Sequence, residues 1–183
     1  LKKGLSINIS CANKDSSKGN IFLYPPFNIN SLPIGSKIFI GFDNLCLKVS
    51  KKNKLQKKLI CKVIKSGYLQ SKKGVHINYP IRLNALTEKD IYALKLGSTM
   101  NINHYAISFV NSHKDINKVK QIVGNKKNII SKIETLNGIK DLKNIAKRSK
   151  ALLIDRGDLS RYIPIEKIPY AQEMIIKKTK SLK

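Results

Sequence analysis

The chain has few of the residues and patterns that mark several common protein classes. No apolar run in its 183 residues approaches the roughly 18–20 residues that a membrane helix needs. The three cysteines are an odd number without a CxxC pair, which argues against a disulfide framework or a zinc knuckle. The three histidines show no metal-ligand spacing, and the chain opens without an apolar secretory signal. We therefore expect a reduced, cytoplasmic protein.

Acidic residues and arginine are also scarce, and this affects how the strong positive charge is interpreted. The formal net charge is +25, from 36 lysines and arginines against 11 aspartates and glutamates. Such a charge favours nucleic acid or another anionic surface as a partner. Only four of the 36 basic residues are arginines, however, and the lysines are scattered along the whole chain. Proteins that read bases or phosphates tend to use arginine forks, so we expect a nonspecific lysine coat and disfavour nucleic-acid binding.

The first part of the sequence is typical of a small all-β domain. Short apolar runs at 38–41, 45–49 and 59–64 are separated by turn residues, and no long segment carries a convincing helical stripe. The lysine-rich segments 51–54 and 57–58 are expected to form a solvated turn between two of these strands. We assign residues 1–75 to this domain.

From residue 76 onward the pattern changes to alternating strands and helices, and we assign residues 76–183 to a second domain. Strands are predicted at 105–110, 128–133 and 151–154, and helices at 87–96, 113–123, 136–148 and 165–180. Gly97 is expected to stop the first helix, whereas Ser112 caps the second and Gly124 ends it. This alternation predicts a parallel α/β sheet, either doubly wound or part of a β/α barrel.

Charged residues interrupt one of these apolar strands at its C-terminal end, where parallel β/α folds place their active sites. Lys132 and Glu134 lie two positions apart, so their side chains are expected to point the same way. Such a pair is costly to desolvate unless each member has a partner or an anionic ligand. The alternative is a plain salt bridge at the mouth of the barrel. The sequence contains no GxxxxGK[ST] or GxGxxG loop, which argues against a nucleotide-binding sheet of those types.

The strand at 151–154 runs directly into a second charged segment, which begins at Asp155. Gly157 lets the backbone come close to a ligand, so its N–H and that of Asp158 can bind an anion. Asp158 can pair with Glu134 to hold a divalent cation, and two carboxylates with open water positions suit Mg²⁺ or Mn²⁺. The alternative is an Asp-Arg turn that caps the next helix.

Together these segments resemble the pyruvate kinase family. The family's catalytic strand reads IISKIEN, and residues 129–135 read IISKIET. Its metal-and-substrate strand reads ARGDLG, and residues 155–160 read DRGDLS. Further similarity lies in QSKKGV at 70–75 against GSKKGV, LTEKDI at 86–91 against LSEKDI, and AISFV at 106–110 against ASFI. The match covers most of the chain from about Phe27 onward.

The resemblance implies a partial TIM (β/α) barrel preceded by a small all-β lid domain that is incomplete at its N-terminus. It implies the glycolytic phosphoryl transfer between phosphoenolpyruvate and ADP, which gives pyruvate and ATP. Lys132 would be the catalytic cation that neutralises the phosphoryl group, and Glu134 and Asp158 would bind Mg²⁺ or Mn²⁺. The backbone of Gly157 and Asp158 would bind the substrate carboxylate, and Lys73 would lie on the nucleotide side, under the lid. The family also suggests a homo-oligomer without a membrane partner.

Several departures from the family pattern accompany this resemblance. The usual ligands of K⁺ and a threonine that aids proton transfer have no counterpart in this chain. The DDG turn of the lid reads Gly-Phe-Asp at 41–43, and Asp155 and Ser160 replace an alanine and a glycine beside the metal site. Asp155 is expected either to bind the metal or to pair with Arg156 or Arg161.

The expected barrel strands are too few to close a barrel by themselves. Three strands of an eight-stranded barrel leave two sheet edges and an apolar inner face unpaired. We therefore expect a fragment, or a divergent protein that pairs with another chain. The alternative function is a non-catalytic relative that binds a small anion or a partner protein.

Overall fold

Two compact units make up the chain. The structure, a computed structural model, describes residues 1–17, 19–41, 45–81 and 83–180. The units comprise Leu1–Leu83 and Asn84–Lys183, and each has its own hydrophobic core. No helix in the described part of the chain is long and apolar enough to cross a membrane. The predicted counterpart of the lid turn includes Phe42 and Asp43, which lie outside the described residues.

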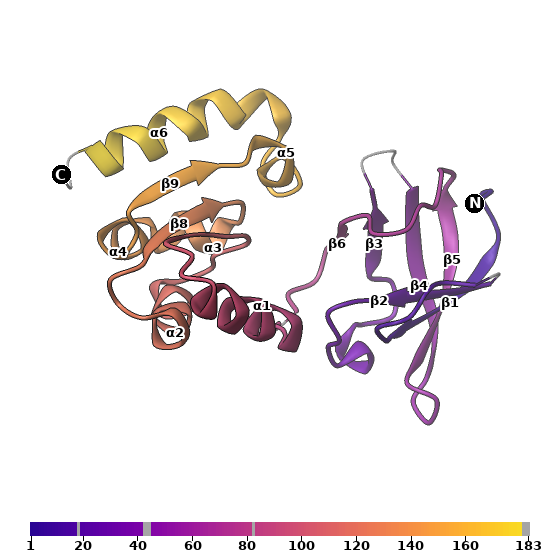
Figure 1. The fold of residues 1–183 in the computed structure, drawn as a ribbon. Coiled ribbons are helices and arrows are strands. Elements are labelled where there is room, and N and C mark those ends of the chain that lie inside the picture. The colour runs from indigo at the N-terminus through magenta and orange to yellow at the C-terminus, as the bar shows by residue number, and fades with distance from the viewer. Residues whose placement is uncertain (18, 42–44, 82, 181–183) are drawn as a thin grey trace. The chain divides into compact units, whose positions relative to one another are not determined.

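The first unit is built around a six-stranded sheet with the strand order β2-β1-β5-β4-β3-β6 (Figure 1). Its elements are β1 (Ser6–Cys11), β2 (Asn20–Leu23), the 3-10 turn η1 (Ile29–Ser31), β3 (Lys37–Ile40), β4 (Leu45–Asn53), β5 (Lys58–Lys65) and β6 (Val75–Ile77). Strands β1 and β2 pair in parallel, and the other neighbours pair antiparallel. Alternate side chains of β5, namely Leu59, Cys61 and Val63, are buried in the core. The predicted strands in this region are confirmed as β3, β4 and β5.

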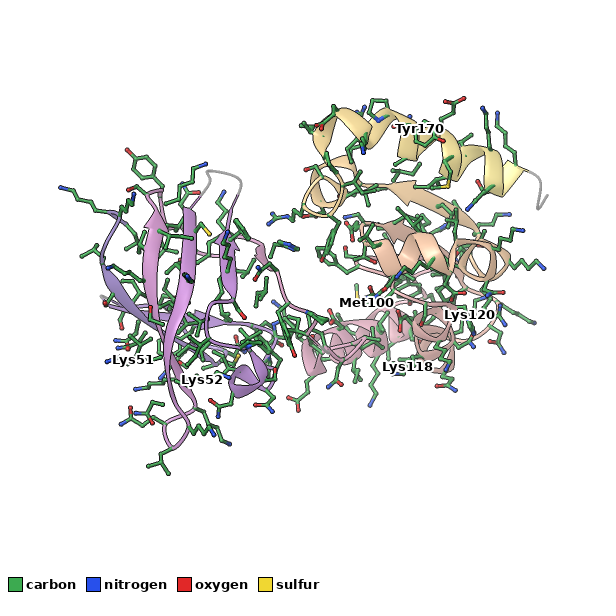
Figure 2. The ribbon with its side chains drawn as sticks, turned by 180° about the vertical axis from the view of Figure 1, so that it is seen from behind. Lys51, Lys52, Met100, Lys118, Lys120 and Tyr170 are labelled. Carbon is green, nitrogen blue, oxygen red and sulfur yellow. The ribbon has the colours of Figure 1, made fainter. Side chains whose placement is uncertain are left out.

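The lysine-rich turn between β4 and β5 is shorter than predicted. Strand β4 continues to Asn53, so the prediction of a turn from residue 51 is wrong. Lys52 pairs with Leu59 and Asn53 pairs with Lys58 after a register shift in the ladder. Figure 2 labels Lys51 and Lys52 on this hairpin. Backbone hydrogen bonds hold the extension, and they form regardless of how polar the side chains are.

The second unit contains a three-stranded parallel sheet with the order β7-β8-β9 (Figure 1). Its strands are β7 (His104–Ile107), β8 (Asn128–Ile133) and β9 (Ala151–Ile154). Its helices are α1 (Glu88–Thr99), α2 (His113–Val123), α3 (Leu136–Lys140), α4 (Leu142–Arg148), α5 (Arg156–Leu159) and α6 (Ile168–Lys180), with the 3-10 turn η2 (Ile165–Lys167) before α6. Ile129 and Ile133 of β8 pack in one core with Ile116 of α2 and Ile145 of α4. The predicted parallel sheet and its alternation with helices are confirmed. The strand predicted at 105–110 is wrong at its end, because β7 stops at Ile107 and the backbone turns at Phe109, which has a left-handed φ of 53°.

Gly97 does not end the first helix of this unit. Helix α1 continues to Thr99, so the prediction of a stop at Gly97 is wrong. A Cβ atom at Gly97 would lie 3.1 Å from two atoms of the Tyr105 side chain. The glycine therefore allows close packing against β7. Ser112 and Gly124 are confirmed as the N-cap and C-cap of α2.

The single helix predicted at 136–148 is divided in two at Asp141. The backbone there has φ −97° and ψ 16°, which separates α3 from α4. The Asp141 carboxylate accepts the His113 N–H at 2.8 Å and lies 2.6 Å from His113 Nδ1. It also accepts a hydrogen bond from Asn144 Nδ2 at 2.6 Å. The prediction fails because the break is stabilised by a residue that is distant in the sequence.

Candidate active site

The ends of two neighbouring parallel strands bring the candidate residues together. Ile133 at the end of β8 pairs with Ile154 at the end of β9. The residues that follow, Glu134 and Asp155, therefore leave the two strands side by side. Asp158 comes one turn later, in α5, which directly follows β9 in Figure 1. This is the edge of a parallel sheet at which active sites form.

Lys132 lies between two carboxylates. Its Nζ is 2.7 Å from Glu134 Oε1 and 3.0 Å from Asp155 Oδ2. The prediction that Lys132 and Glu134 point the same way is therefore confirmed. Contact with Glu134 raises the pKa of Lys132 above its ordinary value, burial opposes this rise, and contact with Asp155 adds to it. The ammonium is thus charged at neutral pH.

Glu134 is fully buried, with 0% of its side chain exposed. Its Oε2 accepts the backbone N–H of Phe109, near the start of the loop that follows β7. Among the described residues, Oε1 has the Lys132 ammonium as its ion partner and accepts no well-aligned hydrogen bond. A buried carboxylate stays charged only when such partners offset its desolvation. Phe109 has a left-handed φ of 53°, a conformation that is rare for large side chains and is often found at functional sites.

The carboxylate of Asp155 lies over the backbone of the segment that was predicted to bind an anion. Its Oδ1 accepts the Asp158 N–H at 3.3 Å. A Cβ atom at Gly157 would lie 3.5 Å from the same oxygen. The alternative in which an aspartate caps the following helix is confirmed for Asp155. Contact with Lys132, followed by the Asp158 N–H, lowers the pKa of Asp155 below its ordinary value.

Asp158 is held by an arginine that lies one helical turn later. Its Oδ1 is 3.0 Å from Arg161 Nε. Asp155, the carboxylate next to the strand, instead forms an ion pair with Lys132. Each acidic group that follows the two strands therefore lies beside a cation.

The three carboxylates are close enough to share one ion. One oxygen from each of Glu134, Asp155 and Asp158 lies within 4.8 Å of the other two. Carboxylates at this spacing repel one another unless positive charge lies among them. Oxygen ligands of this kind suit Mg²⁺ or Mn²⁺. The residues present therefore fit a divalent cation.

An open hollow of about 440 Å³ lies beside these residues, between α5 and α6. It is lined by Arg156, Gly157, Ser160, Ile165, Ile168, Pro169 and Gln172. In the part of the chain that the structure describes, Lys132, Glu134 and Asp158 do not line it. The hollow therefore reaches the predicted substrate-binding backbone at Gly157 but not the predicted catalytic lysine.

Lys73, the predicted nucleotide-binding lysine, belongs to the first unit. It lies exposed in the loop between β5 and β6. Its role stays a prediction.

Sequence reasoning missed two features of the site. The first is the Phe109 N–H that binds Glu134, because a backbone donor is not visible in the residue type. The second is Lys132 as the partner of Asp155. The unusual aspartate was visible in the sequence, but its partner depends on how β8 pairs with β9.

Comparison with known proteins identifies a family for this arrangement. A family model described as the barrel domain of pyruvate kinase matches residues 1–183. The pyruvate kinase of Clostridium perfringens is 36% identical over 186 residues, which cover 97% of this chain and 38% of that protein. That of Dictyostelium discoideum is 33% identical over 154 residues, covering 82% of this chain and 30% of that protein.

A further relative gives the same result. The pyruvate kinase of Borreliella burgdorferi is 35% identical over 149 residues, which cover 79% of this chain and 31% of that protein. The chain therefore spans between 30% and 38% of the length of these curated relatives.

Proposed function

The chain belongs to the pyruvate kinase family, and on this premise we propose that it carries that enzyme's phosphoryl-transfer site. In the proposed reaction, phosphoenolpyruvate donates its phosphoryl group to ADP, which gives pyruvate and ATP. The observation that carries the proposal is the convergence of one lysine, Lys132, with Glu134 and Asp158 at the ends of two parallel strands.

We also propose that the two units correspond to the lid and to part of the barrel. The all-β composition of the first unit and the parallel βα units of the second support this assignment. Barrel enzymes of this type build their sites at the C-terminal ends of the strands, and β8 and β9 end at the candidate residues.

In the proposed mechanism Lys132 neutralises the phosphoryl group. Phosphoryl transfer depends mostly on positioning and on the stabilisation of charge. The ammonium of Lys132 supplies a positive charge at neutral pH, because contact with Glu134 raises its pKa. Glu134 is itself held in place by the Phe109 N–H, so it orients the ammonium from a buried position.

Glu134 and Asp158 would hold Mg²⁺ or Mn²⁺ in this proposal. When bound, such a cation neutralises charge on the oxygens of the phosphoryl group and of the enolate. The backbone N–H groups of Gly157 and Asp158 would bind the substrate carboxylate, and Lys73 would contact the nucleotide. Arg161 would have a different role from Lys132, since it lies beside the proposed metal ligand Asp158.

The second candidate function is that of a non-catalytic relative that binds a small anion or a partner protein. The ion pair between Lys132 and Asp155 favours it. An ammonium that already has two carboxylates beside it has less positive charge to offer a phosphoryl group.

Substitution of Lys132 tests the proposed function. Lys132→Met should retain Mn²⁺ binding but bind phosphoenolpyruvate at least about tenfold more weakly, because one charge-assisted contact is lost. Binding of millimolar phosphoenolpyruvate to the Mn²⁺-loaded chain would be measured by calorimetry. Mn²⁺ is included throughout because Lys132→Met removes the ammonium beside the buried Glu134, and that carboxylate then needs another cation. Lys132→Arg, which keeps the charge, is the control, and unchanged phosphoenolpyruvate binding by the methionine variant would contradict the proposal.

A further inference from the structure

The Asp155 carboxylate contacts two of the groups that are proposed to bind an anionic substrate. One of its oxygens, Oδ2, lies 3.0 Å from the Lys132 ammonium, and the other accepts the Asp158 N–H at 3.3 Å. These are the proposed phosphoryl-binding cation and one of the proposed carboxylate-binding N–H groups. A single carboxylate from within the chain therefore contacts both ends of the proposed anion site.

The position of Asp155 explains how it reaches both groups. It follows Ile154, which pairs with Ile133, so its side chain leaves β9 next to Lys132 and Glu134 of β8. The turn into α5 then folds the Gly157–Asp158 backbone against the same carboxylate. Both contacts involve a charged carboxylate, and such hydrogen bonds are stronger than those between neutral groups.

We propose that Asp155 determines the ligand specificity of this site by acting as a built-in competitor for the substrate's anionic groups. This inference rests on the proposed function. Phosphoenolpyruvate must displace Asp155 from Lys132 and from the Asp158 N–H before it can bind there. The displaced carboxylate then lies close to an incoming anion, and like charges at short range repel each other. The chain therefore binds a divalent cation readily and binds phosphoenolpyruvate weakly.

Removal of the Asp155 carboxylate tests the inference. The Mn²⁺ affinity of the full chain would be measured first, by electron paramagnetic resonance. The affinity of the Mn²⁺-loaded chain for phosphoenolpyruvate would then be measured by calorimetry. Asp155→Ala should bind phosphoenolpyruvate about tenfold or more tightly than the unsubstituted chain. Loss of stability weakens binding, so a gain in affinity cannot come from a damaged fold.

A second variant keeps the test decisive if the alanine variant folds poorly. Asp155→Asn retains the size of the side chain and an oxygen that can accept the Asp158 N–H, but it loses the charge beside Lys132. It should bind phosphoenolpyruvate more tightly than the unsubstituted chain and less tightly than Asp155→Ala. Glu173→Gln is the matched control, because it removes one negative charge from an ion pair with Lys177 on a surface that is 60% exposed at Glu173. Its affinities should not change.

Three outcomes would overturn the inference. If both Asp155 variants and the unsubstituted chain bind phosphoenolpyruvate equally, Asp155 is no competitor, while the proposed function stands. If Asp155→Ala weakens Mn²⁺ binding and leaves phosphoenolpyruvate binding unchanged, Asp155 is a metal ligand instead. If no form of the chain binds millimolar phosphoenolpyruvate, the inference and the proposed function both fail.

Discussion

At the scale of single residues, the site depends on how charged groups are compensated where water is scarce. Glu134 has no exposed surface and is stabilised by one ammonium and one backbone N–H. Removal of one partner from such a buried ion pair destabilises the fold by on the order of 3–5 kcal/mol, because an uncompensated charge is left without water. The same logic applies to Asp141, which joins two helices away from the site.

Asp141 should make the stability of the chain depend on pH in the acidic range. Burial alone would raise the pKa of Asp141, but hydrogen bonds from His113 and Asn144 outweigh burial and lower the pKa to about 2, from an ordinary 3.8. A lowered pKa stabilises the fold above the ordinary value, and this stability is lost as pH falls through about 2. At neutral pH the contribution is about 2 kcal/mol.

The variant Asp141→Asn tests this expectation. It should lower the free energy of unfolding at pH 7, and the difference from the unsubstituted chain should shrink as the pH approaches 2. Urea unfolding followed by far-ultraviolet circular dichroism measures this, since the described α-helices all lie in the second unit. Glu173→Gln, on the surface, should change the free energy by less than about 1 kcal/mol. A difference that is the same at every pH would show that Asp141 acts through its shape and not its charge.

At the scale of elements, close packing decides where helices can lie. Gly138 in α3 is buried, and a Cβ atom there would lie 2.6 Å from the carbonyl oxygen of Val110. Its N–H donates to Thr135 Oγ1 at 3.0 Å, and Thr135 in turn donates to Asn111 Oδ1 at 2.9 Å. The start of α3 is thereby attached to the loop that also supplies the Phe109 N–H.

Gly138→Ala should destabilise the second unit although alanine favours helices. The new methyl group must push against the backbone, which costs about 1–3 kcal/mol. A contact of 2.6 Å with backbone, which cannot move aside as a flexible side chain can, places the cost in the upper part of that range. The gain in helix propensity, about 1 kcal/mol, is therefore smaller than the cost. Thermal unfolding would measure the change. Asn137→Ala, at an exposed neighbouring position, should be neutral or slightly stabilising, and an equally stable Gly138→Ala would contradict the packing account.

The elements also show which parts of this fold are visible in a sequence. The strands at 128–133 and 151–154 match β8 and β9, because each is a compact apolar run between polar loops. The break at Asp141 and the extension of β4 were not predicted, because both depend on partners that are distant in sequence or on backbone pairing alone. The residue types alone were therefore enough to predict Lys132 and Glu134 as site residues. The contacts of Asp155 could not be predicted without knowing how β8 pairs with β9.

At the scale of the whole molecule, the distribution of charge separates the candidate site from its surroundings. The chain has only 11 acidic residues against 36 basic ones, yet Glu134, Asp155 and Asp158 gather at one end of a sheet. Lysines extend from both units, as Lys52 on the β4–β5 hairpin and Lys118 on α2 show in Figure 2. A net charge of +25 attracts anions such as nucleotides and phosphorylated acids over long distances. Among the described residues, the acidic cluster is where we propose that a divalent cation binds.

Binding of Mn²⁺ to the full chain, followed by electron paramagnetic resonance, tests the central claim most directly. Glu134→Gln and Asp158→Asn should each weaken Mn²⁺ binding by about tenfold or more, because each removes one carboxylate from the proposed cation site. Glu173→Gln, which removes the same charge from the surface of α6, should leave the affinity unchanged. If all three variants bind Mn²⁺ as the unsubstituted chain does, the contact of Lys132 with Glu134 is a salt bridge and nothing more.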